Sequence, residues 1–393
     1  MSQLAQVAEV EKAEKGPLIS SRLIKIVICT VLVLVLLSLF ALSSHHGYGF
    51  ILAKHGFAKI RQGYLLIYAR RVLCSTATFL KDDNASTAGG RYRCQVNQAR
   101  AEYAAVGHTY KNNLQDYTSF GDWLYFSRTE KWEPFDEMHF DGENLPLANY
   151  RGTFTHNPVT IALYGLSMHG RFLGGDPYAR KQFLRVADRL IQMQDASGAF
   201  RYPFAWYYYL TDRDYQPGWC SSLAQGLGLS VFARAYHLTG DKKYLAAGDK
   251  AFSFLLVPVS SGGVMDSMAN LDPGLSKDII FEEYPAIPSG HTLNGFMYTM
   301  IGIYDWSHVP TGRAPEATHY FSLCMETLRS ILPYYDLGGF TAYDLGYLIY
   351  QKQPRIGVNY HAVHIYLLHA LVSITGDAKL QRYEKLWASY VPQ

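Results

Sequence analysis

Residues 360–390 read YHAVHIYLLHALVSITGDAKLQRYEKLWASY, and this stretch decides the fold class. Its first half is apolar or aromatic on all sides, as a buried helix would be. The second half carries apolar residues at helical spacing on one face, at Leu380, Tyr383, Leu386, Trp387 and Tyr390. Between the halves, Gly376 predicts a left-handed helix end and Asp377 predicts the cap of the next helix. The stretch therefore predicts a hairpin of one buried and one half-exposed helix.

The same pattern recurs along the chain. Helix-like runs begin near Pro158, Ala224, Leu293 and Tyr360, at intervals of 66, 69 and 67 residues. Three of these runs end in a Gly-Asp pair, at Gly175-Asp176, Gly240-Asp241 and Gly376-Asp377. A recurring pair of a buried and an amphipathic helix is typical of repeat architectures. For residues 151–393 we therefore expect an all-α domain, an (α/α) toroid of alternating inner and outer helices with its long connectors at one mouth.

Composition excludes some classes of partner. A net charge of +3 over 393 residues is too small to indicate nucleic acid, and 49% hydrophobic residues are enough for a large core. The 31 tyrosines suit stacking on sugar rings, although packing explains most of them. The cysteines show no CxxC spacing and predict no metal site. Cys74 and Cys94 are able to pair in an oxidising compartment.

An apolar segment lies near the N-terminus. We expect residues 1–22 to form a disordered cytoplasmic tail. We expect residues 23–43 to form a transmembrane signal-anchor, because the 17 residues from Ile26 to Leu42 carry no charge. Basic residues before the segment favour a cytoplasmic N-terminus, and no small-x-small cleavage site follows it. We expect a single-pass type II membrane protein, with the rest of the chain in the Golgi lumen or the periplasm. We expect residues 44–150 to form a juxtamembrane and N-terminal region, and the sequence leaves the fold of this region open.

The connector before the third run carries conspicuous polar residues. Residues 281–298 read FEEYPAIPSGHTLNGFMY. Because a residue before proline disfavours the helical conformation, we expect Tyr284 to be extended. Glu282, Glu283 and Tyr284 then form a loop whose polar groups face either a ligand or solvent. From this stretch alone, an active-site wall and a charged surface loop are about equally favoured.

Several motifs resemble the C-terminal domain of the D-glucuronyl C5-epimerases, which act on heparosan-type glycosaminoglycans. They are EEYP with Pro288, LNGFMY and IGIYDW; Pro217-Gly218-Trp219 with Ala224-Gln225-Gly226; and Tyr343-Asp344-Leu345 with Asn359-Tyr360-His361. The resemblance runs in order from about Asn157 to the C-terminus. It implies the same toroid fold and the conversion of D-glucuronate to L-iduronate within a heparosan-like polysaccharide. No cofactor or metal is expected.

The resemblance also implies roles for individual residues. Tyr284, Tyr343, Tyr360 and Glu283 are the implied catalytic residues, and Asn294 is an implied substrate contact. Epimerisation at C5 requires acid–base groups on opposite faces of the sugar and a group that neutralises the enediolate. A phenol has an ordinary pKa of about 10, so it needs tuning as a base, but its neutral form donates a proton readily. Without the resemblance, core packing is the commoner role of a tyrosine.

One position departs from the family pattern. The family continues Tyr-Asp-Leu with Arg-His, whereas this chain has Gly346-Tyr347. The cation expected near the substrate carboxylate is therefore missing there. Arg355 and Arg201 are the candidates to replace it, and Glu282 completes the expected substrate-binding set. This departure bears on the identity of the substrate more than on the type of reaction.

Other functions are compatible with the same residues. A polysaccharide lyase begins with the same proton abstraction but then expels the C4 substituent. An (α/α) glycoside hydrolase would use two carboxylates, such as Glu282 or Glu283 with Asp344. A glycan-binding toroid would keep the groove without the chemistry. His361 and His364 predict polar packing more than a metal site, and the sequence leaves a monomer and a homodimer open.

Overall fold

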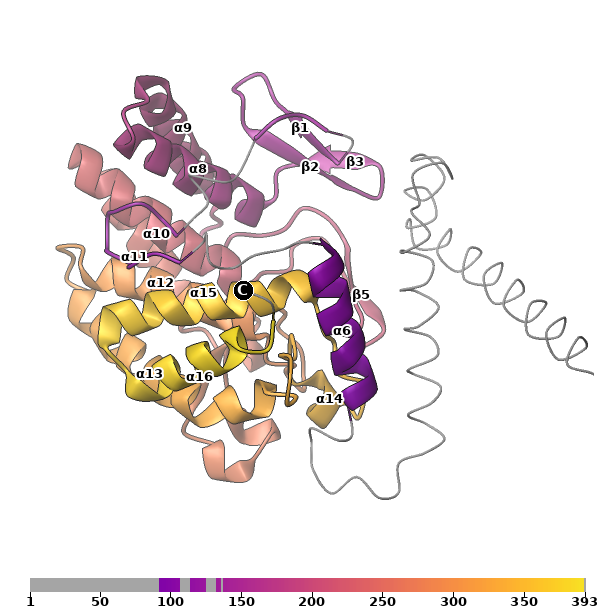
Figure 1. Cartoon of the computed structure of the whole chain (residues 1–393). Helices are drawn as coiled ribbons and strands as arrows, with labels where there is room; N and C mark the ends of the chain where they lie inside the picture. The colour runs from indigo at the N-terminus through magenta and orange to yellow at the C-terminus, as the bar shows by residue number, and fades with distance from the viewer. Residues whose placement is uncertain (1–91, 107–113, 125–131, 136, 392–393) are drawn as a thin grey trace, which may run out of the picture. The chain divides into compact units, whose positions relative to one another are not determined.

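The computed structural model describes residues 92–106, 114–124, 132–135 and 137–391 (Figure 1). All of these residues lie within the unit Ile67–Gln393. The expected tail, the expected anchor at 23–43 and Cys74 lie outside the described residues. Among the helices of the described part, none is long and apolar enough to cross a bilayer.

Helical hairpins make up most of the fold. They are α8 (Pro158–Leu173) with α9 (Pro177–Met193), α10 (Ser222–Thr239) with α11 (Lys242–Leu255), α12 (Leu293–Ser307) with α13 (Ala314–Tyr335), and α15 (Val358–Thr375) with α16 (Ala378–Ala388). The first helix of each hairpin begins within two residues of its predicted start, so the predicted helical repeat is confirmed. These first helices lie side by side in the order α8, α10, α12, α15 (Figure 1).

Capping residues set the hairpin turns as the sequence predicts. Gly240 and Gly376 end α10 and α15 in the left-handed conformation, with φ of 70° and 66°. Asp241 and Asp377 then accept hydrogen bonds from the first backbone N–H groups of α11 and α16. Asp176 caps α9 in the same way. A short polar side chain thus satisfies amide groups that have no partner within the helix.

The first helices of the hairpins are the more buried ones and are called the inner helices below. Two glycines allow the inner helices α10 and α12 to approach closely. A Cβ atom on Gly226 would lie 2.6 Å from Thr299 Cα, and one on Gly302 would lie 2.1 Å from the Gly226 carbonyl oxygen. Any larger residue would force the two helices apart. This close approach places the N-terminal ends of both helices, and the connectors that lead into them, next to each other.

The domain is mostly helical, as expected, but the described part also contains short antiparallel sheets before and between the hairpins. β1 (Met138–Phe140), β2 (Pro146–Tyr150) and β3 (Thr153–Thr155) form one sheet; β4 (Trp206–Tyr208) pairs with β5 (Arg213–Tyr215), and β6 (Met265–Ser267) with β7 (Ile279–Phe281). Three 3₁₀ turns in the described part lie near β6, at Val259–Ser261, Met268–Asn270 and Pro273–Leu275. Aromatic and β-branched residues favour the pleated conformation in these strands.

Two further helices complete the described part. α6 (Arg93–Val106) packs against α15, and the single-turn α14 (Gly346–Ile349) lies in the connector before α15. Cys94 in α6 is disulfide-bonded, whereas Cys220 and Cys324 are buried free thiols.

A buried ion pair ties the segment 114–124 to the inner helices. Arg234 of α10 contacts Asp305 of α12 at 2.6 Å, and neither side chain is exposed to solvent. The Tyr117 hydroxyl donates to Asp305 at 2.7 Å, and Arg234 donates to the Gly121 carbonyl at 3.0 Å. Because each charge is paired and hydrogen-bonded, removal of one partner would leave an uncompensated buried charge.

Candidate active site

Connectors from different repeats meet at the N-terminal ends of the inner helices. Ser222, the first residue of α10, donates its N–H to the Glu282 carbonyl at 3.0 Å. Leu293, the first residue of α12, donates to the Tyr343 carbonyl at 3.1 Å. Tyr343 in turn donates its N–H to the Arg355 carbonyl at 2.8 Å. Backbone bonds therefore hold the EEYP segment and the Tyr343 loop in a defined arrangement.

Glu283 lies at the centre of the candidate site. The Tyr343 hydroxyl donates to Glu283 Oε1 and the Asn294 amide to Oε2, both at 3.4 Å. The Tyr284 hydroxyl interacts with Glu283 and with Tyr343. Tyr360, the third residue of α15, places its ring 4.4 Å from that of Tyr343. The structure thus brings together the carboxylate and the three phenols that the motifs single out.

Gly295, the residue after Asn294, is part of the site although the sequence reasoning missed it. A Cβ atom at this position would lie 2.4 Å from Glu283 Oε2. Glycine is therefore required here for the buried carboxylate to approach the first turn of α12. A signal was present, because glycine in the first turn of a helix lowers helix propensity and needs another reason to be there.

Burial raises the pKa of the Glu283 carboxyl to about 7, against the opposing effects of hydrogen bonds from Tyr284 and Tyr343 and of the Arg355 charge. Burial also raises the pKa of the Tyr284 and Tyr343 phenols well above the ordinary value, and the Glu283 charge adds to this effect. The pKa of Tyr360 rises for the same reasons. Near neutral pH the phenols are therefore neutral proton donors, and Glu283 is poised both to accept and to release a proton.

Arg355 provides a cation beside the cluster. Its guanidinium carbon lies 4.7 Å from the ring centroid of Tyr343 and 4.5 Å from that of Tyr209, a cation–π arrangement on both sides. Burial raises the pKa of Glu283, Tyr343 and Tyr360, and the positive charge of Arg355 opposes this rise in each. Arg355 therefore acts electrostatically on the whole cluster.

Arg201, the other arginine that the sequence offers, has different neighbours. It pairs with Asp195 at 2.8 Å, donates to the Gly218 carbonyl at 3.3 Å and lies over the Phe254 ring. The structure does not bring Arg201 to the Glu283 cluster in the described part of the chain. Its predicted role in substrate binding stays a prediction.

The structure explains the glycine at position 346. A Cβ atom on Gly346 would lie 2.2 Å from Leu210 Cδ2 and 2.9 Å from Asp344 Oδ1. Leu210, which follows β4, is 2% exposed. Its side chain therefore fills the space that an arginine at position 346 would enter.

Glu282 belongs to a separate buried network. His291 Nδ1 lies 2.5 Å from Glu282 Oε1, and His291 Nε2 lies 2.6 Å from Asn270 Oδ1. The His291 backbone has a φ of 56° and its N–H donates to Glu282 Oε2 at 3.2 Å. This network fixes the loop that joins β7 to α12. The predicted substrate contact by Glu282 stays a prediction.

A row of stacked rings supports Tyr284. Its ring stacks on Tyr208 at 5.3 Å, and Tyr208 packs against Tyr215 at 5.4 Å. Tyr215 stacks on Trp219 at 5.2 Å, and Trp219 on Tyr202 at 3.9 Å. Trp219 is the tryptophan of the Pro-Gly-Trp motif. Packing of this kind restricts the Tyr284 ring to one orientation.

His361 and His364 pack as polar residues. The Nδ1 atoms of both rings face Thr341 Oγ1, at 3.0 and 2.9 Å. Burial lowers the pKa of both imidazoles, so they are neutral. Within the described residues, no group of three or more histidine, cysteine or carboxylate side chains is placed to hold a metal ion. His156 contacts Asp141 at 3.0 Å, and Asn157 caps α8.

Asp344 is a second buried carboxyl in this region. Because of its raised pKa, we expect the folding stability of the protein to depend on pH. Burial raises its pKa to about 7, although the Gly346 N–H donates to it at 2.9 Å. In the unfolded chain the carboxyl loses its proton from about pH 4, whereas the folded protein retains it to about pH 7. The stability that this group contributes is therefore lost as pH rises through that interval.

Asp344→Asn should remove this effect while an amide oxygen still accepts the Gly346 N–H. We expect the stability of the variant relative to the native protein to rise by up to about 4 kcal/mol between pH 4 and pH 7. Urea midpoints of both proteins across this range provide the measurement. Glu283 titrates in both proteins and cancels in the difference. A difference that does not change with pH would contradict the prediction.

Comparison with known proteins identifies the family of this region. Residues 194–389 match the family described as D-glucuronyl C5-epimerase C-terminus. D-glucuronyl C5-epimerase of Caenorhabditis elegans is 34% identical over 219 residues, which cover 53% of this chain and 34% of that protein. An uncharacterized protein of Methanocaldococcus jannaschii is 29% identical over 171 residues, covering 43% of this chain and 52% of that protein. The chain thus spans about a third and about half of the lengths of these two relatives.

Similar solved structures include two carbohydrate-active enzymes. A family 76 glycoside hydrolase from a bovine Bacteroides thetaiotaomicron strain has a TM-score of 0.42 and 13% identity, covering 74% of this chain and 54% of that chain. A polysaccharide lyase has a TM-score of 0.37 and 9% identity, covering 59% of this chain and 57% of that chain. Neither similarity is strong enough to support an argument. The matched stretch 194–389 contains the candidate-site residues Glu283, Tyr284, Tyr343 and Tyr360. Through this stretch the chain carries a domain of the D-glucuronyl C5-epimerase C-terminal family.

Proposed function

We propose that this protein is a uronate C5-epimerase that converts D-glucuronate to L-iduronate within a heparosan-like polysaccharide. The observation that carries the proposal is the cluster of Glu283 with Tyr284, Tyr343 and Tyr360. It combines one carboxyl whose pKa is about 7 with neutral phenols from two different connectors. Proton exchange at a carbon next to a carboxylate needs this combination of a base and a donor.

In the first step the C5–H bond breaks and its proton passes to Glu283, either directly or through the Tyr343 hydroxyl. The Tyr343 route is available because this hydroxyl already donates to Glu283 Oε1. The electron pair of the broken bond moves into the sugar carboxylate and forms an enediolate. A base with a pKa near the working pH suits this step.

In the second step a phenol returns a proton to C5 on the opposite face. The phenol O–H bond breaks, a new C5–H bond forms and the carboxylate is restored. Glu283 then gives its proton to the phenolate, so the site returns to its starting state. Tyr284 precedes α12 and Tyr360 lies in the first turn of α15, so a sugar bound between the Tyr284 loop and the start of α15 would have a phenol on each face.

The enediolate carries additional negative charge, which two features of the site oppose. One is the Arg355 guanidinium over the Tyr343 ring. The other is the pair of helix N-termini at Asn294 in α12 and Tyr360 in α15, where the backbone dipoles favour an anion. We propose that these groups replace the arginine that the family pattern places at position 346.

The function is tested by incubating the full-length protein with heparosan and with N-sulfated heparosan in deuterated water. We expect deuterium at C5, new L-iduronate and unchanged chain length. Absorbance from unsaturated uronate would indicate a lyase instead, and new reducing ends would indicate a hydrolase. Binding of the polymer without any of these products would indicate a glycan-binding protein.

We also propose that the helical hairpins belong to an (α/α) toroid and that the domain works on the non-cytoplasmic side of a membrane, anchored through residues 23–43. The disulfide at Cys94 supports an oxidising compartment. We expect the full-length protein to resist carbonate extraction and to keep an N-terminal tag on the cytosolic side. Recovery of a soluble form that begins after residue 42 would rule out the anchor.

A further inference from the structure

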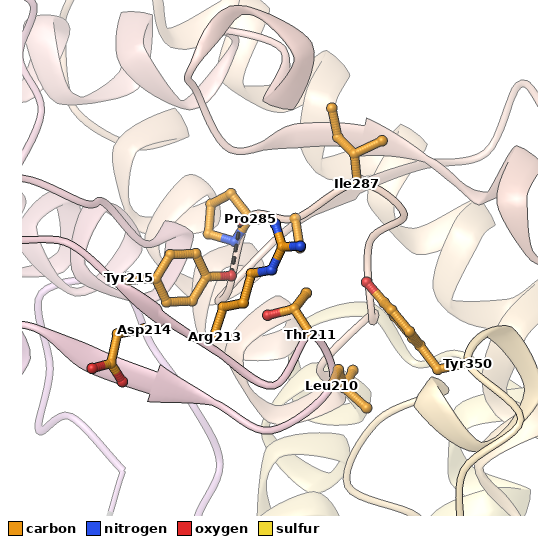
Figure 2. Close-up of a pocket in the computed structure, with 9 residues that line it drawn as sticks. Leu210, Thr211, Arg213, Asp214, Tyr215, Pro285, Ile287 and Tyr350 are labelled. Carbon is orange, nitrogen blue, oxygen red and sulfur yellow. Dashed lines mark hydrogen bonds between the residues drawn. The ribbon is translucent and has the colours of Figure 1, made fainter.

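A pocket of about 600 Å³ lies between the β4–β5 hairpin and the turn that follows Tyr284 (Figure 2). Arg213 and Tyr215 of β5 line one side, Pro285 and Ile287 line a second, and Tyr350 lies beside them at the end of α14. The volume is sufficient for a small ligand such as a sugar residue. None of these side chains has a part in the mechanism proposed above.

The pocket and the Glu283 cluster share a wall. Pro285 follows Tyr284 directly in the chain, and the Tyr215 hydroxyl donates to the Pro285 carbonyl at 2.8 Å, as Figure 2 shows. The Tyr208 ring lies between the two sites, packing on Tyr215 on one side and on Tyr284 on the other. An occupant of the pocket would therefore be a near neighbour of a sugar held at Tyr284.

The charges around the pocket leave Arg213 available for a ligand. Asp212 pairs with Lys352 at 2.8 Å, and Asp214 accepts two hydrogen bonds from Arg151, at 2.9 and 2.8 Å. Arg213 lies between these two residues, is exposed, and forms no ion pair among the residues that the structure describes. In Figure 2 its side chain extends on the same side of β5 as Tyr215, whereas Asp214 points away. A guanidinium of this kind suits a carboxylate or sulfate, both of which accept two parallel hydrogen bonds.

Apolar surface in the pocket suits the face of a sugar ring. Ile287 is 78% exposed and lines the pocket together with Pro285 and Tyr350. The Tyr350 hydroxyl donates to the Pro288 carbonyl, so this ring is fixed against the same turn. A bound sugar would cover this apolar surface while its charged substituent met Arg213.

We propose that this pocket binds an anionic sugar residue of the polymer close to the uronate that reacts, with Arg213 pairing with its carboxylate or sulfate. This inference rests on the proposed function, since it assigns a further subsite to the same substrate. The shared chemistry of the ligand is an anionic group on a pyranose ring. Which group it is can be decided by experiment.

The test compares Arg213→Gln and Arg213→Lys with the native full-length protein on heparosan and on N-sulfated heparosan. We expect Arg213→Gln to raise KM about tenfold with kcat changed by less than about twofold, since it removes a charged hydrogen bond to a sugar residue other than the one that reacts. Arg213→Lys keeps the charge and should recover part of the affinity. Arg180→Gln removes the same charge from an exposed position on α9 and should leave KM unchanged.

Direct binding of both polymers, measured by calorimetry, separates this inference from the proposed function. If the native protein shows no deuterium exchange at C5, the proposed function fails, yet an about tenfold loss of affinity in Arg213→Gln would still support the pocket. Equal losses on both polymers identify the carboxylate as the ligand, and a loss confined to N-sulfated heparosan identifies the sulfate. If Arg213→Gln binds both polymers as tightly as the native protein, the inference is overturned.

Discussion

Glu283→Gln is expected to lower the turnover of C5 epimerisation by about 10²–10⁴-fold, the range of a positioned acid–base group. Glu283 is 6% exposed, and burial raises its pKa to about 7. It is thus the carboxyl of the cluster that exchanges a proton near neutral pH. An amide of the same shape still accepts a hydrogen bond from Tyr343 but binds no proton in this range. The loss should therefore be in kcat, with little change in KM.

Initial rates of L-iduronate formation by the two proteins, at saturating heparosan, provide the measurement. Glu326→Gln is a matched control, because Glu326 is an exposed residue of α13. Near-native turnover in Glu283→Gln would show that another group abstracts the proton. A protein with native thermal stability and no turnover would exclude misfolding as the cause of the loss.

Tyr284→Phe, Tyr343→Phe and Tyr360→Phe are each expected to lower turnover by at least ~10²-fold. Phenylalanine keeps the ring, so the stack on Tyr208 and the contact between the Tyr343 and Tyr360 rings are preserved. Tyr343→Phe should have a second effect. Its hydroxyl lowers the pKa of Glu283, so without it the acidic limb of the pH–rate profile should move to higher pH.

The isotope pattern tells the phenols apart. A variant that keeps the base but lacks the donor on the opposite face should incorporate deuterium at C5 without inverting the centre. Mass spectrometry of the recovered glucuronate, together with the amount of L-iduronate, separates exchange from inversion. Tyr383→Phe on α16 serves as the control, since this tyrosine lies outside the cluster. If all three variants epimerise at near-native rates, a phenol mechanism is ruled out and Glu282 and Glu283 become the candidates.

The helical repeat could be predicted from the sequence because its determinants are local. The apolar runs and the Gly-Asp pairs each act within a few residues, and α8, α10, α12 and α15 begin where these signals place them. The short strands β4 and β5 were not predicted. Each is only three residues long, so neither contains enough alternation to be distinguished from a loop.

The site could be predicted in part. Motifs single out Glu283 and the three tyrosines, but their proximity depends on contacts between residues about 60 or more positions apart. Arg355 and Arg201 both lie in polar connectors, and only the fold shows that one sits over the Tyr343 ring and the other pairs with Asp195. The fit of Leu210 against Gly346 is a relation between distant positions that no local pattern contains.

The buried ion pair between Arg234 and Asp305 indicates where a stably folded fragment of this protein must begin. The match to the family model starts at residue 194, yet Tyr117 and Gly121 supply hydrogen bonds to Asp305 and Arg234 in the interior. A fragment cut at residue 194 would contain both charges without these partners, at a cost of several kcal/mol if either is left uncompensated. The folding unit therefore begins before the matched region and includes the segment 114–124.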